Sequence, residues 1–148
     1  LIASNRAVLP FGRALGLALQ CSRGGRAKDG MGGRLTTHVL DTAQGRPAAG
    51  LWIELFRLDG GTRELIVQAE TNEDGRCDRP LLEGAAMKAG LYELVFRAGD
   101  YLRQSGLVLP DPPFLDDVPV RFGISASDRH YHVPLLLSPY GYSTYRGS

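Results

Sequence analysis

Three histidines are the side chains of this sequence best suited to acid–base chemistry, and all three lie in segments expected to form strands. His38 shares a strand face with Thr36, and His130 shares one with His132, because side chains two apart in a strand point the same way. A neutral imidazole, with a pKa near 6.5, can accept a proton at physiological pH. Each histidine is therefore a candidate base, and the alternative for each is a core histidine satisfied by one hydrogen bond.

The same histidines allow a second interpretation, a zinc site. His130 and His132 form a His-x-His pair, and His38 could complete three ligands around an ion that keeps one open position. No cysteine or carboxylate stands at ligand spacing beside the pair. The sequence therefore gives the zinc interpretation less support than acid–base chemistry.

Two further polar groups point to a reactive site. Arg76 follows a turn at Asp74-Gly75, where its guanidinium could grip a planar acceptor or stabilise developing negative charge. The alternative is an ordinary surface arginine.

The last four residues, 145–148, bring a phenol, a guanidinium, a glycine and a hydroxyl directly after an expected strand. We expect this tail to be tied into a site, with a frayed chain end as the alternative.

Length and composition limit the classes of protein to consider. The 148 residues are 43% apolar and 22% charged, with a net charge of +1, which suits one globular domain. No basic stripe accompanies the aromatic residues, so nucleic acid is not an expected partner. The sequence contains no Gly-rich phosphate loop and no nucleophile elbow. No apolar run is long enough to span a bilayer, so no membrane partner is expected.

Residues 1–33 differ from the rest of the chain. They contain five basic residues against one acid and show neither a helical nor a strand period. We predict a flexible N-terminal extension, either an organelle presequence or translated upstream sequence, followed by one domain over residues 34–148. Two cysteines, Cys21 and Cys77, make no disulfide framework. A reducing, cytoplasmic location is expected, with organelle targeting by the extension as the alternative.

Short apolar segments separated by turns predict an all-β sandwich. The one expected helix is Gly99–Ser105, capped by Asp100 and ended by Gly106. Pro119 indicates an edge strand or a bulge, and open sheet edges are commonly covered by pairing between subunits. About eight strands are expected, including residues 35–40, 51–58, 64–71, 91–96, 118–124, 130–137 and 141–145.

Four separated motifs resemble one family. They are LTTHVLD (35–41), TNEDGR (71–76), HYHVPLLLSP (130–139) and YRGS (145–148). Together they are similar to the 5-hydroxyisourate hydrolases, the enzyme branch of the transthyretin-like family, and the resemblance covers residues 34–148. The hormone-carrying transthyretins lack the terminal tetrapeptide and the histidines at positions 38 and 132.

The resemblance implies an eight-stranded β-sandwich with one short helix, assembled as a homotetramer (a dimer of dimers) with active sites at the dimer–dimer interface. It implies no metal and no cofactor, and it gives His130 no catalytic role. By motif position it implies that the catalytic residues are His38, Arg76, His132 and Ser148. It implies that the substrate-binding residues are Tyr145, Arg146 and Gly147.

The implied activity is hydrolysis of 5-hydroxyisourate to 2-oxo-4-hydroxy-4-carboxy-5-ureidoimidazoline in urate degradation. Water would attack a ring amide with help from histidine and arginine. The alternative is a transthyretin-like carrier that binds a small molecule without catalysis. In a carrier, position 76 would be expected to be uncharged or acidic, and His38 would not be needed.

Overall fold

The computed structural model describes residues 32–147, which form eleven strands, one α-helix and one 3-10 turn. The helix α1 is Ala98–Gln104 and the 3-10 turn η1 is Gly84–Ala86. The strands are β1 (Arg34–Thr36), β2 (Val39–Asp41), β3 (Arg46–Pro47), β4 (Trp52–Asp59), β5 (Thr62–Glu70), β6 (Leu82–Glu83), β7 (Gly90–Phe96), β8 (Val118–Ile124), β9 (His130–His132), β10 (Leu135–Ser138) and β11 (Gly141–Thr144).

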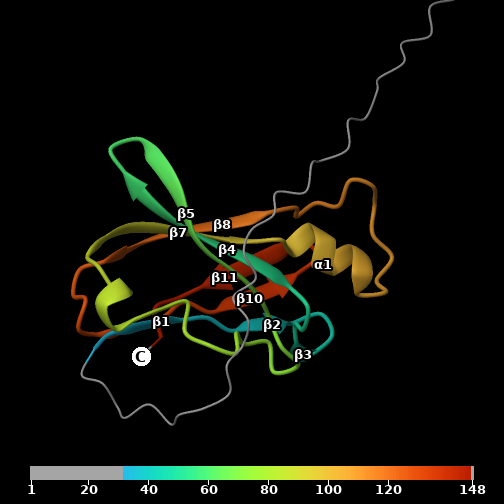
Figure 1. Ribbon diagram of the computed structural model, residues 1–148. Helices are drawn as coiled ribbons and strands as arrows, with labels where there is room; N and C mark the ends of the chain where they lie inside the picture. The colour runs from blue at the N-terminus through green and yellow to red at the C-terminus, as the bar shows by residue number, and fades with distance from the viewer. Residues whose placement is uncertain (1–31, 148) are drawn as a thin grey trace, which may run out of the picture.

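The strands make two layers, with α1 at one end of the sandwich (Figure 1). One layer is the antiparallel sheet β5-β4-β7-β8. The other consists of two short sheets, β6-β1-β9 and β11-β10-β2-β3, in which β1 pairs with β9 and β2 with β10 in parallel. The expected all-β sandwich with one short helix is confirmed.

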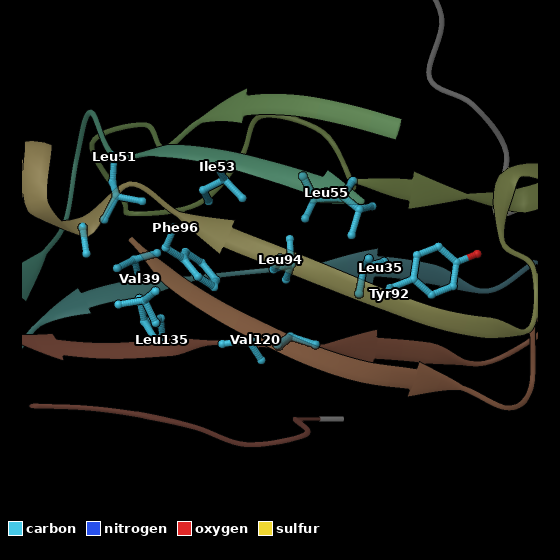
Figure 2. Close-up of a cluster of buried hydrophobic side chains, with 14 of the residues drawn as sticks. Leu35, Val39, Leu51, Ile53, Leu55, Tyr92, Leu94, Phe96, Val120 and Leu135 are labelled. Atoms are coloured by element: carbon cyan, nitrogen blue, oxygen red, sulfur yellow. The ribbon is translucent and has the colours of Figure 1, made fainter. Parts of the chain in front are cut away.

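The core fills the space between the layers (Figure 2). Leu55, Leu94 and Phe96 extend from the antiparallel sheet and are fully buried. Leu35 and Leu135 meet them from the opposite layer and are equally buried. Each such side chain contributes about 1.5–3 kcal/mol when it leaves water, so burial fixes which face of each strand turns inward.

Two segments expected as single strands are each interrupted. The first breaks at Thr37-His38, and the second breaks at Val133-Pro134. Proline has no N–H to donate to a strand ladder, so regular pairing stops there. The segments nevertheless stay side by side, because Val133 donates its N–H to the Thr36 carbonyl (3.0 Å) and Leu135 donates to the His38 carbonyl (2.8 Å). The breaks and the short strands β3 and β6 explain why the structure has more strands than expected.

The helix lies one residue earlier than expected, and its predicted cap is wrong. Asp100 sits inside the first turn, where it pairs with Arg103 at 3.0 Å, and Arg97 occupies the N-cap position without a side-chain capping bond. Gly106, with φ of +83°, follows the last turn, as expected of a residue that ends a helix in the left-handed region. Pro119 lies in β8, an edge strand of its sheet, in agreement with the sequence.

Residues 1–31 and Ser148 lie outside the described part of the chain. The N-terminal extension, the domain boundary and the catalytic role of Ser148 therefore stay predictions. Among residues 32–147, no helix combines the length and apolar character needed to cross a membrane.

Candidate active site

A cavity of about 340 Å³ opens where β1, β9 and the segment after β5 meet. The residues that line it include two histidines and three arginines, and the others are two threonines and one cysteine. Within residues 32–147, none of these arginines has a carboxylate within salt-bridge distance. The cavity therefore suits a polar, electron-rich small molecule. The lining groups used below are Arg34, Thr36, Arg76, Cys77, His130 and His132.

The parallel pairing of β1 with β9 brings both histidines of β9 to one hydroxyl. Thr36 lies opposite His132 in the register, and its Oγ1 is 2.9 Å from Nδ1 of His132. The same Oγ1 is 2.9 Å from Nε2 of His130. One threonine thus links two imidazoles that line the same cavity.

A tight turn brings Arg76 opposite His38. Gly75 adopts a φ of +70°, and a Cβ at this position would lie 2.4 Å from the Val39 carbonyl, so only glycine fits. Asn72 holds the turn closed, because its side-chain oxygen accepts the N–H of Arg76 (3.2 Å) and its own N–H donates to the Arg76 carbonyl (2.8 Å). Val39 donates to the Gly75 carbonyl at 2.8 Å. The result is an antiparallel bridge between His38 and Arg76.

The end of the described chain is fastened to His132. Gly147 donates its N–H to the His132 carbonyl at 2.8 Å and forms an antiparallel bridge with that residue. A Cβ on Gly147 would lie 2.8 Å from Cδ2 of the His132 ring. The tail therefore packs its backbone directly on the imidazole, as expected for a terminus tied into a site.

None of the three expected substrate-binding residues, Tyr145, Arg146 and Gly147, lines this cavity. Arg146 stacks over the ring of Tyr131, with its Cζ 4.7 Å from the ring centroid. Tyr145 is 59% exposed, and neither residue lines the cavity that holds His130 and His132. Their role in binding substrate stays a prediction.

The surroundings keep all three histidines neutral at physiological pH. Burial lowers the pKa of His38, and Arg76 lowers it further against an opposing effect of Asp74. Burial also lowers the pKa of His132, with added repulsion from Arg76, His130 and His38. For His130, burial and then Arg34 lower the pKa. Because a neutral imidazole has a free lone pair, each of these residues can act as a base.

Cys77 also lines the cavity, but its thiol is not a nucleophile at neutral pH. Burial and the neighbouring Asp78 raise its pKa to about 11. The thiol therefore stays protonated, and the thiolate is the reactive form.

Among residues 32–147, no three histidine, cysteine, aspartate or glutamate side chains gather as a metal site would require, so the zinc interpretation gains no third ligand there.

Of the catalytic residues expected from the sequence, Arg76 and His132 line the cavity, whereas His38 does not and is connected to it through its bridge to Arg76. Sequence reasoning missed Arg34 and the bridging role of Thr36. Thr36 was recognised only as a neighbour of His38 on a common strand face. Its link to His130 and His132 depends on the register between β1 and β9, which pairs residues almost one hundred positions apart. No local pattern in the sequence carries that information.

The lowered histidine pKa values predict that stability falls with acidification. Below about pH 6.5, where an unfolded histidine binds a proton, the unfolded chain takes up protons more readily than the folded chain. The free energy of unfolding should therefore decrease from pH 7.5 to 5.5, and urea titrations at both values measure it. Hydrogen bonding from Arg121 holds the pKa of Glu93 below 4.5, so Glu93 titrates below this window.

A variant with His38, His130 and His132 all changed to glutamine is the matched control for this prediction. Its unfolding free energy should vary less between the two pH values than that of the unchanged protein. An unchanged protein as stable at pH 5.5 as at 7.5 would contradict the assigned pKa directions.

Gly147→Ala should lower any turnover that depends on His132 by at least about tenfold, because the new Cβ would push against that ring and small displacements of reacting groups are costly. Stopped-flow turnover measures the effect. Gly141→Ala in the same hairpin is the matched control, since its Cβ would meet only the Ser138 hydroxyl, at 3.8 Å. Equal activity of the two variants would show that the contact between the tail and His132 is irrelevant to catalysis.

Comparison with known proteins gives the family. Residues 35–147 match the model of the HIUase/Transthyretin family. The chain is 69% identical over 116 residues to 5-hydroxyisourate hydrolase 2 of Rhizobium meliloti. The aligned region covers 78% of this chain and 97% of that protein. The chain is also similar to the structure of Klebsiella pneumoniae 5-hydroxyisourate hydrolase, with 33% identity, a TM-score of 0.65, and coverage of 78% of this chain and 99% of that one.

A transthyretin structure has a slightly higher TM-score than this hydrolase structure. Sea bream transthyretin, solved in complex with thyroxine, has a TM-score of 0.70 and 27% identity, over 77% of this chain and 94% of that one. The fold alone therefore does not separate enzymes from carriers, whereas sequence identity is much higher to the Rhizobium hydrolase. The family match and the 69% identity to the Rhizobium hydrolase show that the chain belongs to the HIUase/Transthyretin family.

Proposed function

We propose that this protein hydrolyses 5-hydroxyisourate at the cavity between β1 and β9. The observation that carries the proposal is the convergence, on one cavity, of neutral histidines and the guanidinium of Arg76, which pairs with no carboxylate of residues 32–147, in a chain 69% identical to a 5-hydroxyisourate hydrolase. This combination supplies a base and an anion stabiliser. A carrier for an apolar ligand needs neither.

In the proposed mechanism His38 and His132 orient and deprotonate a water molecule. Its oxygen attacks the ring amide carbon, and Arg76 stabilises the negative charge that develops on the carbonyl oxygen. Lowered pKa values leave both imidazoles able to accept the proton. The C–N bond then breaks, the leaving nitrogen takes a proton from an imidazolium, and the former carbonyl becomes a carboxylate.

The terminal tail completes the proposed site. Its Gly147 donates its N–H to the His132 carbonyl, and a Cβ at Gly147 would lie 2.8 Å from the His132 ring. We infer that Ser148 orients a histidine or the water through its hydroxyl or carboxylate. Tyr145 and Arg146 are proposed to contribute to the pocket once subunits assemble.

We further propose a homotetramer, a dimer of dimers with active sites at the dimer–dimer interface. Support comes from the sheet edges: within residues 32–147, β8 and β11 each end their sheets without a further partner. Unpaired edges are commonly covered by another subunit. A cytoplasmic location is proposed on the basis of the free thiol of Cys77.

Turnover of freshly generated 5-hydroxyisourate, followed by stopped-flow absorbance, tests the function. The purified protein should accelerate the loss of substrate absorbance far beyond the decay in buffer. Preincubation with a chelator should leave the rate unchanged, in keeping with the proposed absence of a metal. A protein that binds the compound without accelerating its decay would instead be a carrier.

A further inference from the structure

The hydroxyl of Thr36 occupies an unusual position between two imidazole nitrogens. Its Oγ1 lies 2.9 Å from Nε2 of His130 and 2.9 Å from Nδ1 of His132. A hydroxyl has one proton to donate and lone pairs to accept. With neutral histidines, one imidazole must therefore donate its N–H to Thr36 while the other accepts the Thr36 proton.

This constraint ties the two histidines together. When His132 donates from Nδ1, its Nε2 has a free lone pair, and Thr36 in turn donates to Nε2 of His130. When the direction reverses, His132 carries its proton on Nε2 and no longer acts as a base there. The hydrogen bonds thus allow only paired tautomers, and the base form of His132 requires His130 to accept from Thr36.

We propose that Thr36 and His130 are positioning residues that form, with His132, a proton relay for the hydrolysis. As Nε2 of His132 takes a proton from water, the Nδ1 proton of His132 moves to Thr36 and the Thr36 hydroxyl proton moves to Nε2 of His130. His132 ends neutral with a proton on Nε2, ready to protonate the leaving nitrogen, and His130 holds the positive charge. Return of the protons along the same path restores the start. This inference rests on the proposed function.

The two rings of the relay face different charged groups. His132 faces Arg76 and His38 in addition to His130. His130 faces Arg34, its register partner on the adjacent strand. The described cavity wall contributes a third guanidinium, Arg79, and no carboxylate. With His38 neutral, each ring faces one guanidinium, Arg76 for His132 and Arg34 for His130, and the relay moves the proton away from Arg76.

A simpler role is that Thr36 only satisfies two half-buried ring nitrogens. The two roles separate experimentally, because Thr36→Ser keeps the hydroxyl and Thr36→Val removes it at nearly constant shape. His130→Gln adds a second discrimination: its amide oxygen can still accept the Thr36 proton, but it cannot become charged. Thr42→Val is the matched control, since Thr42 donates to the Leu137 carbonyl at 3.0 Å and does not line the cavity.

The experiment measures kcat and KM for 5-hydroxyisourate from pH 5.5 to 8.5, with ¹⁵N NMR titration of the histidine ring nitrogens. Thr36→Val and His130→Gln should each lower kcat by at least about tenfold with little change in KM. Thr36→Ser should restore kcat to within about threefold, and Thr42→Val should resemble the unchanged protein. The rings of His130 and His132 should titrate together in the unchanged protein and separately in Thr36→Val.

Full activity of folded Thr36→Val or of His130→Gln would overturn the relay, as would independent titration of the two rings in the unchanged protein. If Thr36→Val does not fold, the kcat values of Thr36→Ser and His130→Gln still decide whether the relay operates. The NMR titration needs no substrate, so it distinguishes failure of the relay from failure of the proposed function, which would appear as an unchanged protein without turnover.

Discussion

His132→Ala should lower kcat by about 10²–10⁴-fold, the usual contribution of a positioned base. The residue combines a neutral ring, contact with the cavity, a hydrogen bond to Thr36 and the attachment of the tail. In the proposed mechanism its loss removes one of the two proton acceptors and leaves His38 and Arg76. Stopped-flow turnover under saturating substrate measures the change.

Folding should be largely retained in this variant, because the backbone of His132 keeps its strand pairing with β1 and its bond to Gly147. Circular dichroism and urea unfolding provide the control. A folded His132→Ala protein with near-full kcat would show that another group is the base.

Arg76→Ala should lower kcat by about 10²–10³-fold, comparable to removal of one oxyanion donor in other hydrolases. Its guanidinium lines the cavity, and no carboxylate of residues 32–147 lies within salt-bridge distance of it. Arg76→Lys should recover only part of the loss, since an ammonium cannot make a planar, bidentate contact.

Arg103→Ala is the matched control for Arg76→Ala. Arg103 pairs with Asp100 on the exposed surface of α1, where such pairs contribute little, so its replacement should leave turnover unchanged. Equal kinetics for the two alanine variants would remove Arg76 from the mechanism.

The parts of the fold set by local pattern were predictable. Val118, Val120, Phe122 and Ile124 alternate along one expected strand, and the structure buries all of them except Phe122, which is partly buried. Whether a strand residue is buried depends on the face to which its position turns it, so the alternation of apolar residues can be recognised in the sequence itself. The turn before Arg76 was equally readable, because Asp74-Gly75 needs a positive φ that glycine supplies.

The break at Thr37-His38 was not predictable from local pattern. The segment around His38 reads as one continuous β-branched run, yet it changes partners midway, from β9 and β6 to β10 and β3. Pairing between segments far apart in the chain decides this, and each segment alone fits an unbroken strand.

The site divides in the same way. Residue chemistry and the family resemblance named His38, Arg76 and His132, whereas the link from Thr36 to two imidazoles required the register of β1 against β9. The expected tie between the tail and the site appears at Gly147, but the stacking of Arg146 on Tyr131 follows from packing that the tetrapeptide alone does not encode.

The most direct test of the central claim compares two proteins in one stopped-flow experiment with freshly generated 5-hydroxyisourate. One is the unchanged protein, and the other carries His38→Ala, Arg76→Ala and His132→Ala together. We predict rapid turnover by the first and decay no faster than in buffer with the second, although it remains folded. Substantial turnover by the folded triple variant would contradict the assignment of catalysis to these residues.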